Sequence, residues 1–133
     1  MTIRGSLDSN VLLRLLLHDV PEQHTAARAL LETGDFVVHD AAIIEIIFVL
    51  GRHYRLTRVE QREAILGLLS QSMIVATEAQ FVAAFDLYLE RPKLSFEDCY
   101  LVTAAELEGN GPLFTFDARL ASQTPASLVA DLV

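Results

Sequence analysis

Hydrophobic positions along the chain follow two patterns, and together these predict short strands that alternate with helices. Short apolar runs bounded by polar or turn residues are typical of buried strands, whereas apolar residues that recur every three or four positions are typical of amphipathic helices. The predicted strands are residues 3–7, 36–39, 73–76, 113–116 and, as a possible fifth, 128–132. The predicted helices are residues 9–17, 21–33, 57–71, 78–90 and 95–108, with a further helix through Glu45 to about residue 54 and a short helical turn at 118–121.

This alternation determines the expected architecture. Consecutive strands that are joined through a helix pair in parallel, and the helices then cover both faces of the sheet. At 133 residues the chain has the size of one domain, and no linker, repeat or low-complexity segment interrupts it. We therefore predict a single α/β domain over residues 1–133, a three-layer α/β/α sandwich around a mainly parallel sheet of four or five strands.

One carboxylate, Glu45, lies in the middle of the apolar run at residues 41–50. Read as a helix, this run gives Glu45 only apolar neighbours one turn away, and the nearest cation along it, Arg52, is about 10 Å distant at a rise of about 1.5 Å per residue. A bare charge in a dry site is strongly destabilising, so Glu45 is expected to have a partner or a metal ion. A buried salt bridge to an arginine is the structural alternative.

Three aspartates lie at the ends of predicted strands or at the starts of predicted helices. Asp8 and Asp117 directly follow the first and fourth strands, and Asp98 lies in the first turn of the sixth helix. Ligands of an open parallel sheet bind beyond the carboxyl ends of its strands, so we expect these aspartates and Glu45 to meet in one site. Each aspartate also has a local alternative: Asp8 and Asp117 as helix N-caps, and Asp98 as part of a capping box that starts at Ser95.

Four carboxylates in one pocket require a cation. Two carboxylates about 5 Å apart repel each other by roughly 3 kcal/mol at an effective dielectric constant of about 20. Ligands that are all carboxylate oxygens favour Mg²⁺ or Mn²⁺ over Zn²⁺. Such an ion polarises a phosphoryl oxygen and lowers the pKa of bound water, so this set of residues is suited to metal-assisted hydrolysis of a phosphodiester.

Other enzyme classes fit the sequence less well. A phosphatase of the haloacid-dehalogenase type also has an aspartate after its first strand, but it needs a second acid where this chain has Asn10, and a lysine near the later acids, whereas Lys93 is the only lysine. A phosphoacceptor receiver domain needs an acidic pair at the end of the first strand and a lysine after a late strand, and neither is present. A metal-free nuclease with paired histidines is a further alternative, although the four histidines are scattered along the chain.

The net charge of −8 argues against extensive contact with phosphates, which depends on lysine and arginine. The distribution of the basic residues weakens this objection, because nine of the ten are arginines and four of these lie close together: Arg52, Arg55, Arg58 and Arg62. This cluster is either an ordinary solvated surface or a rim that binds phosphates or an acidic partner.

Composition also bears on assembly and compartment. Hydrophobic residues make up 52% of the chain, more than one small core hides, which favours an oligomer or a protein partner. The single cysteine, Cys99, cannot form an internal disulfide and fits a reducing compartment. Because the sequence shows neither a signal peptide nor an apolar run long enough to span a bilayer, we expect a cytoplasmic protein without a membrane association.

Four segments of the chain resemble, in order and spacing, the motifs of PIN-domain ribonucleases. They are residues 8–14 (Asp-Ser-Asn-Val-Leu-Leu-Arg), Glu45 in its apolar helix, residues 98–102 (Asp-Cys-Tyr-Leu-Val) and residues 115–117 (Thr-Phe-Asp). Within that group the chain looks most similar to the VapC-type toxins of bacterial toxin–antitoxin pairs, and the resemblance covers essentially its whole length.

The resemblance implies a PIN-like fold and an endoribonuclease that depends on Mg²⁺ or Mn²⁺, with structured RNA such as tRNA or rRNA as substrate. It also implies a homodimer that a small antitoxin holds inactive. The acidic metal-binding and catalytic residues of the family correspond to Asp8, Glu45, Asp98 and Asp117, and the polar positions that support them correspond to Asn10 and Thr115. Candidate contacts to RNA or a partner are Arg14, Arg52, Arg55, Arg58, Arg62 and Arg119, and the stretch from Arg52 to Arg62 matches no fixed family motif. The non-enzymatic alternative is a PIN-like module that only binds RNA or protein.

Overall fold

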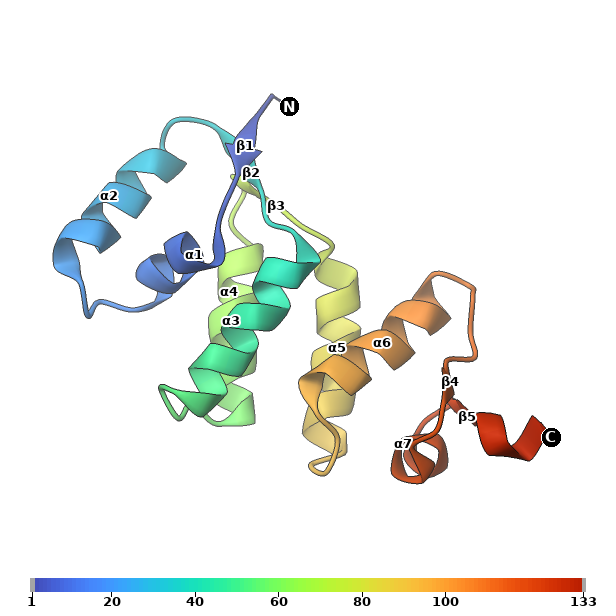
Figure 1. The fold of residues 1–133 in the computed structure, drawn as a ribbon. Coiled ribbons are helices and arrows are strands. Elements are labelled where there is room, and N and C mark those ends of the chain that lie inside the picture. Colours follow the sequence, from blue (N-terminus) through green and yellow to red (C-terminus); the bar gives the residue numbers. More distant parts are fainter. Residues whose placement is uncertain (1, 133) are drawn as a thin grey trace. The chain divides into compact units, whose positions relative to one another are not determined.

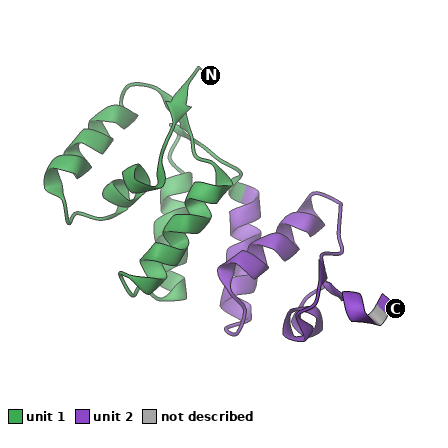
Figure 2. Cartoon of the chain, in the orientation of Figure 1, with its two compact units in different colours: residues 1–78 green, residues 79–133 purple. Residues whose placement is uncertain are grey.

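A computed structural model describes residues 2–132 of the chain (Figure 1). The chain divides into two compact units, residues 1–78 (unit 1) and residues 79–133 (unit 2), which Figure 2 distinguishes by colour. None of the helices within residues 2–132 combines the length and the hydrophobicity that crossing a bilayer would need.

Unit 1 is built on a three-stranded parallel sheet with the strand order β1-β2-β3. The strands are β1 (Ile3–Ser6), β2 (Asp35–Val37) and β3 (Ile74–Val75). In the register of the sheet, Ser6 lies opposite Val37, and Val37 lies opposite Val75. Because each connection between consecutive strands contains helices, the carboxyl ends of all three strands lie at the same edge of the sheet.

Two helical pairs connect these strands. The first pair is α1 (Ser9–Leu16) and α2 (Pro21–Leu31), and the second is α3 (Asp40–Arg52) and α4 (Arg58–Leu69). Helix α1 packs against both α2 and α3, and α3 packs against α4, as Figure 1 shows. The core of the unit consists of hydrophobic side chains from these helices and strands, among them Leu12, Ile43, Leu50, Ile65 and Phe36.

The start of α4 is fixed by a capping box. Thr57 Oγ1 accepts the Glu60 N–H at 3.1 Å, and Glu60 Oε1 accepts the Thr57 N–H at 2.8 Å, so two backbone donors without a helical partner are satisfied. The Thr57 N–H, and then the Thr57 hydroxyl, lower the pKa of Glu60 below its ordinary value of 4.5. The helix predicted at residues 57–71 is therefore confirmed, with Thr57 as its N-cap.

Replacing Glu60 by Ala is expected to destabilise the protein at neutral pH and to have a smaller effect as the pH falls. Folding lowers the pKa of the Glu60 carboxyl group below its ordinary value of 4.5. The ionised Glu60 therefore stabilises the folded protein fully above pH 4.5, and this contribution is lost as the pH falls through the lowered pKa of the folded state. Urea unfolding at neutral pH and at acid pH measures the difference. Glu63→Ala, which removes an exposed glutamate one turn further along α4, is the matched control; an equal loss in both variants, or a loss independent of pH, would contradict the assignment.

Unit 2 contains two longer helices and a small two-stranded parallel sheet. Its elements are α5 (Glu78–Glu90), α6 (Phe96–Leu107), β4 (Phe114–Thr115), α7 (Ala118–Gln123), β5 (Ser127–Leu128) and the 3-10 helix η1 (Val129–Leu132). Between α5 and α6 the rings of five aromatic residues pack together, with centroid separations from 4.7 Å for Phe85–Phe96 to 6.1 Å for Phe81–Phe96. Phe81, Phe85 and Tyr88 are therefore buried core residues of this unit.

The structure confirms the predicted α/β class, the order of the elements and the parallel pairing of the strands. The five strands are hydrogen-bonded in two sets, three in unit 1 and two in unit 2. The strand expected at residues 128–132 is wrong in extent, because β5 ends at Leu128 and the chain continues as the 3-10 helix η1. An apolar run as short as Val129–Leu132 does not by itself distinguish strand from helical turn.

Candidate functional site

The carboxyl edge of the three-stranded sheet carries polar side chains directly after each strand. A hydrogen bond joins Ser6 Oγ, at the end of β1, to His39 Nε2, just after β2, at 3.2 Å. The Thr77 hydroxyl, just after β3, donates to a carboxylate oxygen of Asp40 at the start of α3. Sequence analysis did not single out these residues, and the one signal available was their place after a strand. These hydrogen bonds tie together the loops at this edge of the sheet.

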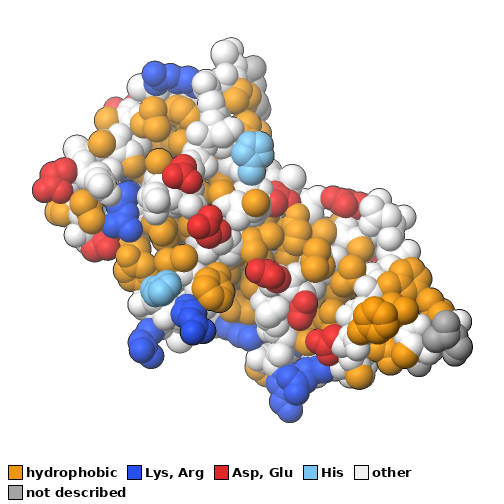
Figure 3. Space-filling view, viewed as in Figure 1, with side chains coloured by type: hydrophobic (Ala, Val, Ile, Leu, Met, Phe, Trp, Pro, Cys, Tyr) orange, Lys and Arg blue, Asp and Glu red, His pale blue; other side chains and the backbone are white. Residues whose placement is uncertain are grey.

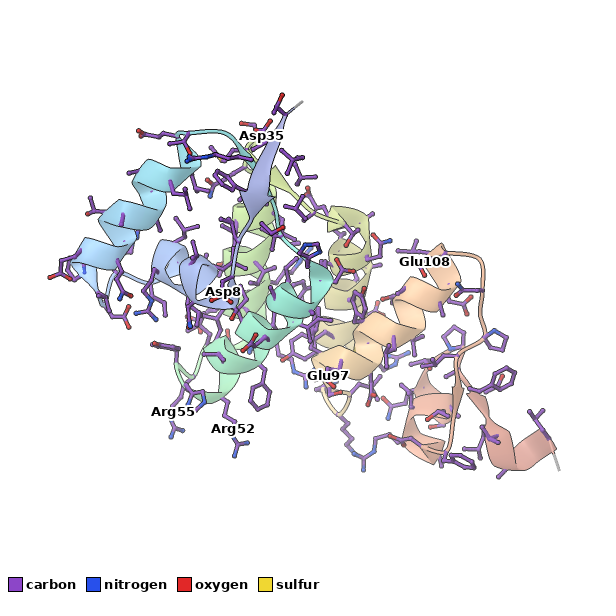
Figure 4. All side chains as sticks on the ribbon, turned by 45° about the horizontal axis from the view of Figure 1, so that its top comes forward. Asp8, Asp35, Arg52, Arg55, Glu97 and Glu108 are labelled. Atoms are coloured by element: carbon purple, nitrogen blue, oxygen red, sulfur yellow. The ribbon has the colours of Figure 1, made fainter. Side chains whose placement is uncertain are left out.

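Asp8 is the N-cap of α1 and is exposed (Figure 4). Its Oδ1 accepts the Ser9 N–H at 2.8 Å and the Ser9 hydroxyl at 3.4 Å. Among residues 2–132, no donor reaches the second carboxylate oxygen, Oδ2. The sequence offered helix capping as the alternative to a functional role for Asp8, and capping is confirmed. Because capping uses only one of the two carboxylate oxygens, it does not prevent Asp8 from also binding an ion.

Glu45 lies in the second turn of α3, and its side chain is exposed. The expectation of a dry setting is wrong, because α3 buries one stripe, Ile43, Ile46, Ile47 and Leu50, and Glu45 lies outside it. The sequence does not reveal this buried stripe, because the exposed face of α3 also carries apolar residues. In the described part of the chain, Glu45 has neither a hydrogen-bond partner nor an ion-pair partner, so the alternative of a buried salt bridge is not observed.

The other two candidate acids belong to unit 2. Asp117 is the N-cap of α7, and its Oδ1 accepts the N–H groups of Arg119 at 2.9 Å and Leu120 at 3.2 Å. As for Asp8, no described residue donates to Oδ2 of Asp117. Thr115 Oγ1 accepts the Asp117 N–H at 3.0 Å, which fits the supporting role that the resemblance implies for Thr115.

Asp98 is half-buried in the first turn of α6. Its N–H donates to Oγ of the N-cap Ser95 at 3.2 Å, so Ser95 caps the helix as the sequence predicted. Over residues 2–132, the Asp98 carboxylate has no hydrogen-bond or ion-pair partner, and the second half of a capping box is not formed. The side chain of Asp98 is therefore not committed to stabilising its own helix.

The candidate contact residues have different surroundings. Arg14 forms an ion pair with Asp19 at 2.8 Å, and the Tyr54 hydroxyl, together with the Asp19 carboxylate, raises the pKa of Arg14 above its ordinary value. The Arg14 guanidinium is therefore paired with Asp19 within unit 1. Asn10 and Arg14 line an open groove of about 290 Å³ between α1 and α2.

Among the remaining arginines, exposure separates two groups. Arg52 and Arg55, at and just after the end of α3, are exposed, and so is Arg119 on α7. Arg58 and Arg62, on the first turns of α4, are half-buried and engaged in further interactions. Figure 4 shows Arg52 and Arg55 projecting away from the loop between α3 and α4.

The four candidate acids are divided equally between the units, Asp8 and Glu45 in unit 1 and Asp98 and Asp117 in unit 2. Within either unit, as far as residues 2–132 are concerned, no three His, Cys, Asp or Glu side chains are grouped so as to hold a metal ion. The chemistry of the donors nevertheless fits a hard divalent ion. All four are carboxylates, and none is paired with a cationic side chain in the described residues.

The chain has an α/β fold in which helices connect parallel strands, and aspartates follow β1 and β4. This combination is typical of proteins with acidic sites at the ends of their strands. Comparison with protein families identifies that class: the family described as "PIN domain" matches residues 6–124. The chain belongs to the PIN domain family, which confirms the fold and places the protein among nuclease-type proteins. A search of curated proteins found no match to the chain.

Proposed function

We propose that the protein is a metal-dependent endoribonuclease that hydrolyses RNA phosphodiester bonds and acts as the toxin of a toxin–antitoxin pair. The observation that carries the proposal is the family match over residues 6–124, which includes all four acids of the motifs, Asp8, Glu45, Asp98 and Asp117. The state of these side chains supports it, because Asp8 and Asp117 each keep a carboxylate oxygen without a described donor.

Asp8, Asp98 and Asp117 would hold the ion, Mg²⁺ or Mn²⁺, in this proposal. When bound, the ion would supply positive charge to the phosphoryl oxygen and lower the pKa of a bound water. The N-cap bonds of Asp8 and Asp117 fix the orientation of each carboxylate, since one oxygen is anchored to the first turn of a helix. Thr115 fixes the backbone of Asp117 in turn.

Glu45 has a separate role in the proposal. Its carboxylate is exposed and unpaired among the described residues, so it can accept a proton from the attacking water or complete the set of ligands. The water oxygen forms a new bond to phosphorus, the bond from phosphorus to the 3′ oxygen breaks, and the 3′ oxygen gains a proton. The products are a 5′-phosphate and a 3′-hydroxyl.

The partners follow from the resemblance to VapC-type toxins. We propose a structured RNA substrate such as tRNA or rRNA, a homodimer, a cognate antitoxin that suppresses activity, and a cytoplasmic location. All 133 residues would form a single PIN-like domain when the protein is active. The exposed arginines Arg52, Arg55 and Arg119 are the candidates for contact with the RNA backbone.

Incubation of the protein with RNA and Mn²⁺ is expected to give products with 5′-phosphate and 3′-hydroxyl ends. The proposed reaction uses water as the nucleophile, whereas a metal-free nuclease with paired histidines would use the 2′-hydroxyl and leave a 2′,3′-cyclic phosphate. Digestion of the products by an exonuclease that requires a 5′-phosphate measures the difference. As a control, a single 2′-deoxy substitution at the cut site should leave cleavage intact. Cyclic-phosphate ends would overturn the mechanism, and RNA that is bound but never cut would favour a non-catalytic binding module.

A further inference from the structure

The exposed face of α3 carries an aromatic ring one turn beyond Glu45. Phe48 is 58% exposed, although phenylalanine is usually buried, and it follows Glu45 by three positions on the same side of the helix. The Arg52 guanidinium lies over the Phe48 ring, 6.0 Å from its centroid, within the range of a cation–π interaction. A carboxylate, a ring and a guanidinium therefore follow one another along this face.

Arg55, three residues further on, has an unusual backbone conformation. Its φ is +56°, the left-handed region that favours glycine, and it is the one non-glycine residue with positive φ in residues 2–132. The chain leaves α3 through this residue, and the Leu56 N–H returns to the Leu50 carbonyl at 3.0 Å. Glycine would adopt this turn more readily than arginine, so the exposed Arg55 side chain is kept at a conformational cost.

The charge of this region differs from that of the chain. Residues 52–62 contain four arginines and one acid, Glu60, whereas the whole protein has a net charge of −8. The Glu60 carboxylate is already engaged in the capping box of α4. Figure 3 shows basic side chains beside hydrophobic ones near the end of α3, on a surface that elsewhere carries many acids.

We propose that Phe48, Arg52 and Arg55 form a nucleotide platform that binds one unpaired RNA nucleotide beside Glu45. The ring would stack on the base, Arg52 would add its charge at the edge of the stack, and Arg55 would contact the neighbouring phosphate. A base inside a duplex has both faces covered, so the platform selects RNA that is unpaired at this position. This inference rests on the proposed function and names the form of RNA that the same site takes.

A ribonucleotide fits these residues better than a second copy of the chain does. A contact between two copies of a surface that exposes Arg52 and Arg55 would bring like charges together, whereas phosphate neutralises them. An exposed ring with a guanidinium over it also provides the two kinds of contact that single strands need, stacking on the base and charge toward the backbone.

The test measures binding of a short labelled oligouridine and of a duplex RNA by fluorescence anisotropy, with the full chain in low salt and EDTA so that cleavage is suppressed. Wild type should bind the single strand more tightly than the duplex. Phe48→Ala should weaken single-strand binding about tenfold, and Phe48→Tyr, which keeps the ring, should bind like wild type. Phe114→Ala removes a phenylalanine of similar exposure, 55%, from unit 2 and serves as the matched control.

Arg55→Gly provides a second, independent readout. Removing one phosphate contact should lower the slope of log affinity against log salt by about 0.7 for a single strand. Because glycine adopts positive φ readily, the melting temperature should stay the same or rise, so weaker binding would not reflect loss of folding. Arg28→Ala, which removes an exposed arginine from α2, controls for the change in net charge.

Several outcomes would overturn the platform. Oligouridine binding that is absent in wild type, or that is unchanged in Phe48→Ala, would do so. A dimer that dissociates on Phe48→Ala, measured by sedimentation, would assign the ring to a contact between copies of the chain. Cleavage of RNA with Mn²⁺ by wild type separates these results from the proposed function: cleavage with an inert platform overturns only this inference, whereas no cleavage of any RNA counts against the nuclease itself.

Discussion

Replacing Asp8 by Asn is expected to lower the rate of RNA cleavage by on the order of 10³-fold, about 4 kcal/mol of transition-state stabilisation, without lowering the melting temperature. Asparagine and aspartate are equivalent N-caps, so the side-chain oxygen of Asn continues to accept the Ser9 N–H at the start of α1. The substitution removes the negative charge that the proposed ion requires and leaves the local structure in place.

Two further variants make this result specific. Asp8→Ala should lose activity as well and should also destabilise the protein by about 1 kcal/mol, because the cap of α1 is lost. Asp19→Asn removes an acid of the same unit whose partner is Arg14, and its cleavage rate should stay close to that of wild type. Cleavage by Asp8→Asn at a rate within about tenfold of wild type would mean that Asp8 only caps its helix.

Millimolar Mn²⁺ is expected to raise the melting temperature of the wild-type protein. An ion that binds the folded chain alone, at a hundred times its Kd, adds about 2.7 kcal/mol to the free energy of unfolding. For a protein of this size that corresponds to an increase of roughly 8–15 °C in the melting temperature. The physical reason is the repulsion among unpaired carboxylates, which a divalent ion relieves.

The control for this experiment is a variant in which all four acids are neutralised, Asp8→Asn, Glu45→Gln, Asp98→Asn and Asp117→Asn together. In the absence of metal it should be at least as stable as wild type, and Mn²⁺ should not shift its melting temperature. NaCl at equal ionic strength controls for screening. A wild-type protein whose melting temperature does not respond to Mn²⁺ would count against the proposed metal site.

Much of unit 1 and of the helices of unit 2 could be predicted because local signals there agree with the tertiary structure. Thr57 and Glu60 have the spacing of a capping box, and Asp8, shortly after the end of β1, is the cap of α1. A position between a strand and a helix is typical of both helix caps and ligand sites, so the sequence left capping and ion binding as alternatives for Asp8 and Asp117. The structure shows why they are compatible, since capping uses Oδ1 alone.

Other features depend on information that the sequence does not contain. Glu45 lies among apolar residues on both sides, so the sequence alone does not indicate which stripe of α3 is buried, and the exposure of Glu45 and Phe48 emerges from packing. The left-handed conformation of Arg55 is set by the way the chain leaves α3, and arginine is not the residue that signals it. The Ser6–His39 hydrogen bond joins residues far apart in the chain and needs the sheet to bring them together.

The central claim of the proposed function is that Asp8, Asp98 and Asp117 hold a divalent ion, and calorimetric titration with Mn²⁺ tests it most directly. The comparison uses wild type, Asp8→Asn from unit 1, Asp98→Asn from unit 2 and the variant that combines the two. The account predicts one class of site in wild type, at least about tenfold weaker binding in each single variant, and no measurable binding in the combined variant. Binding as tight as in wild type in either single variant would contradict this set of ligands.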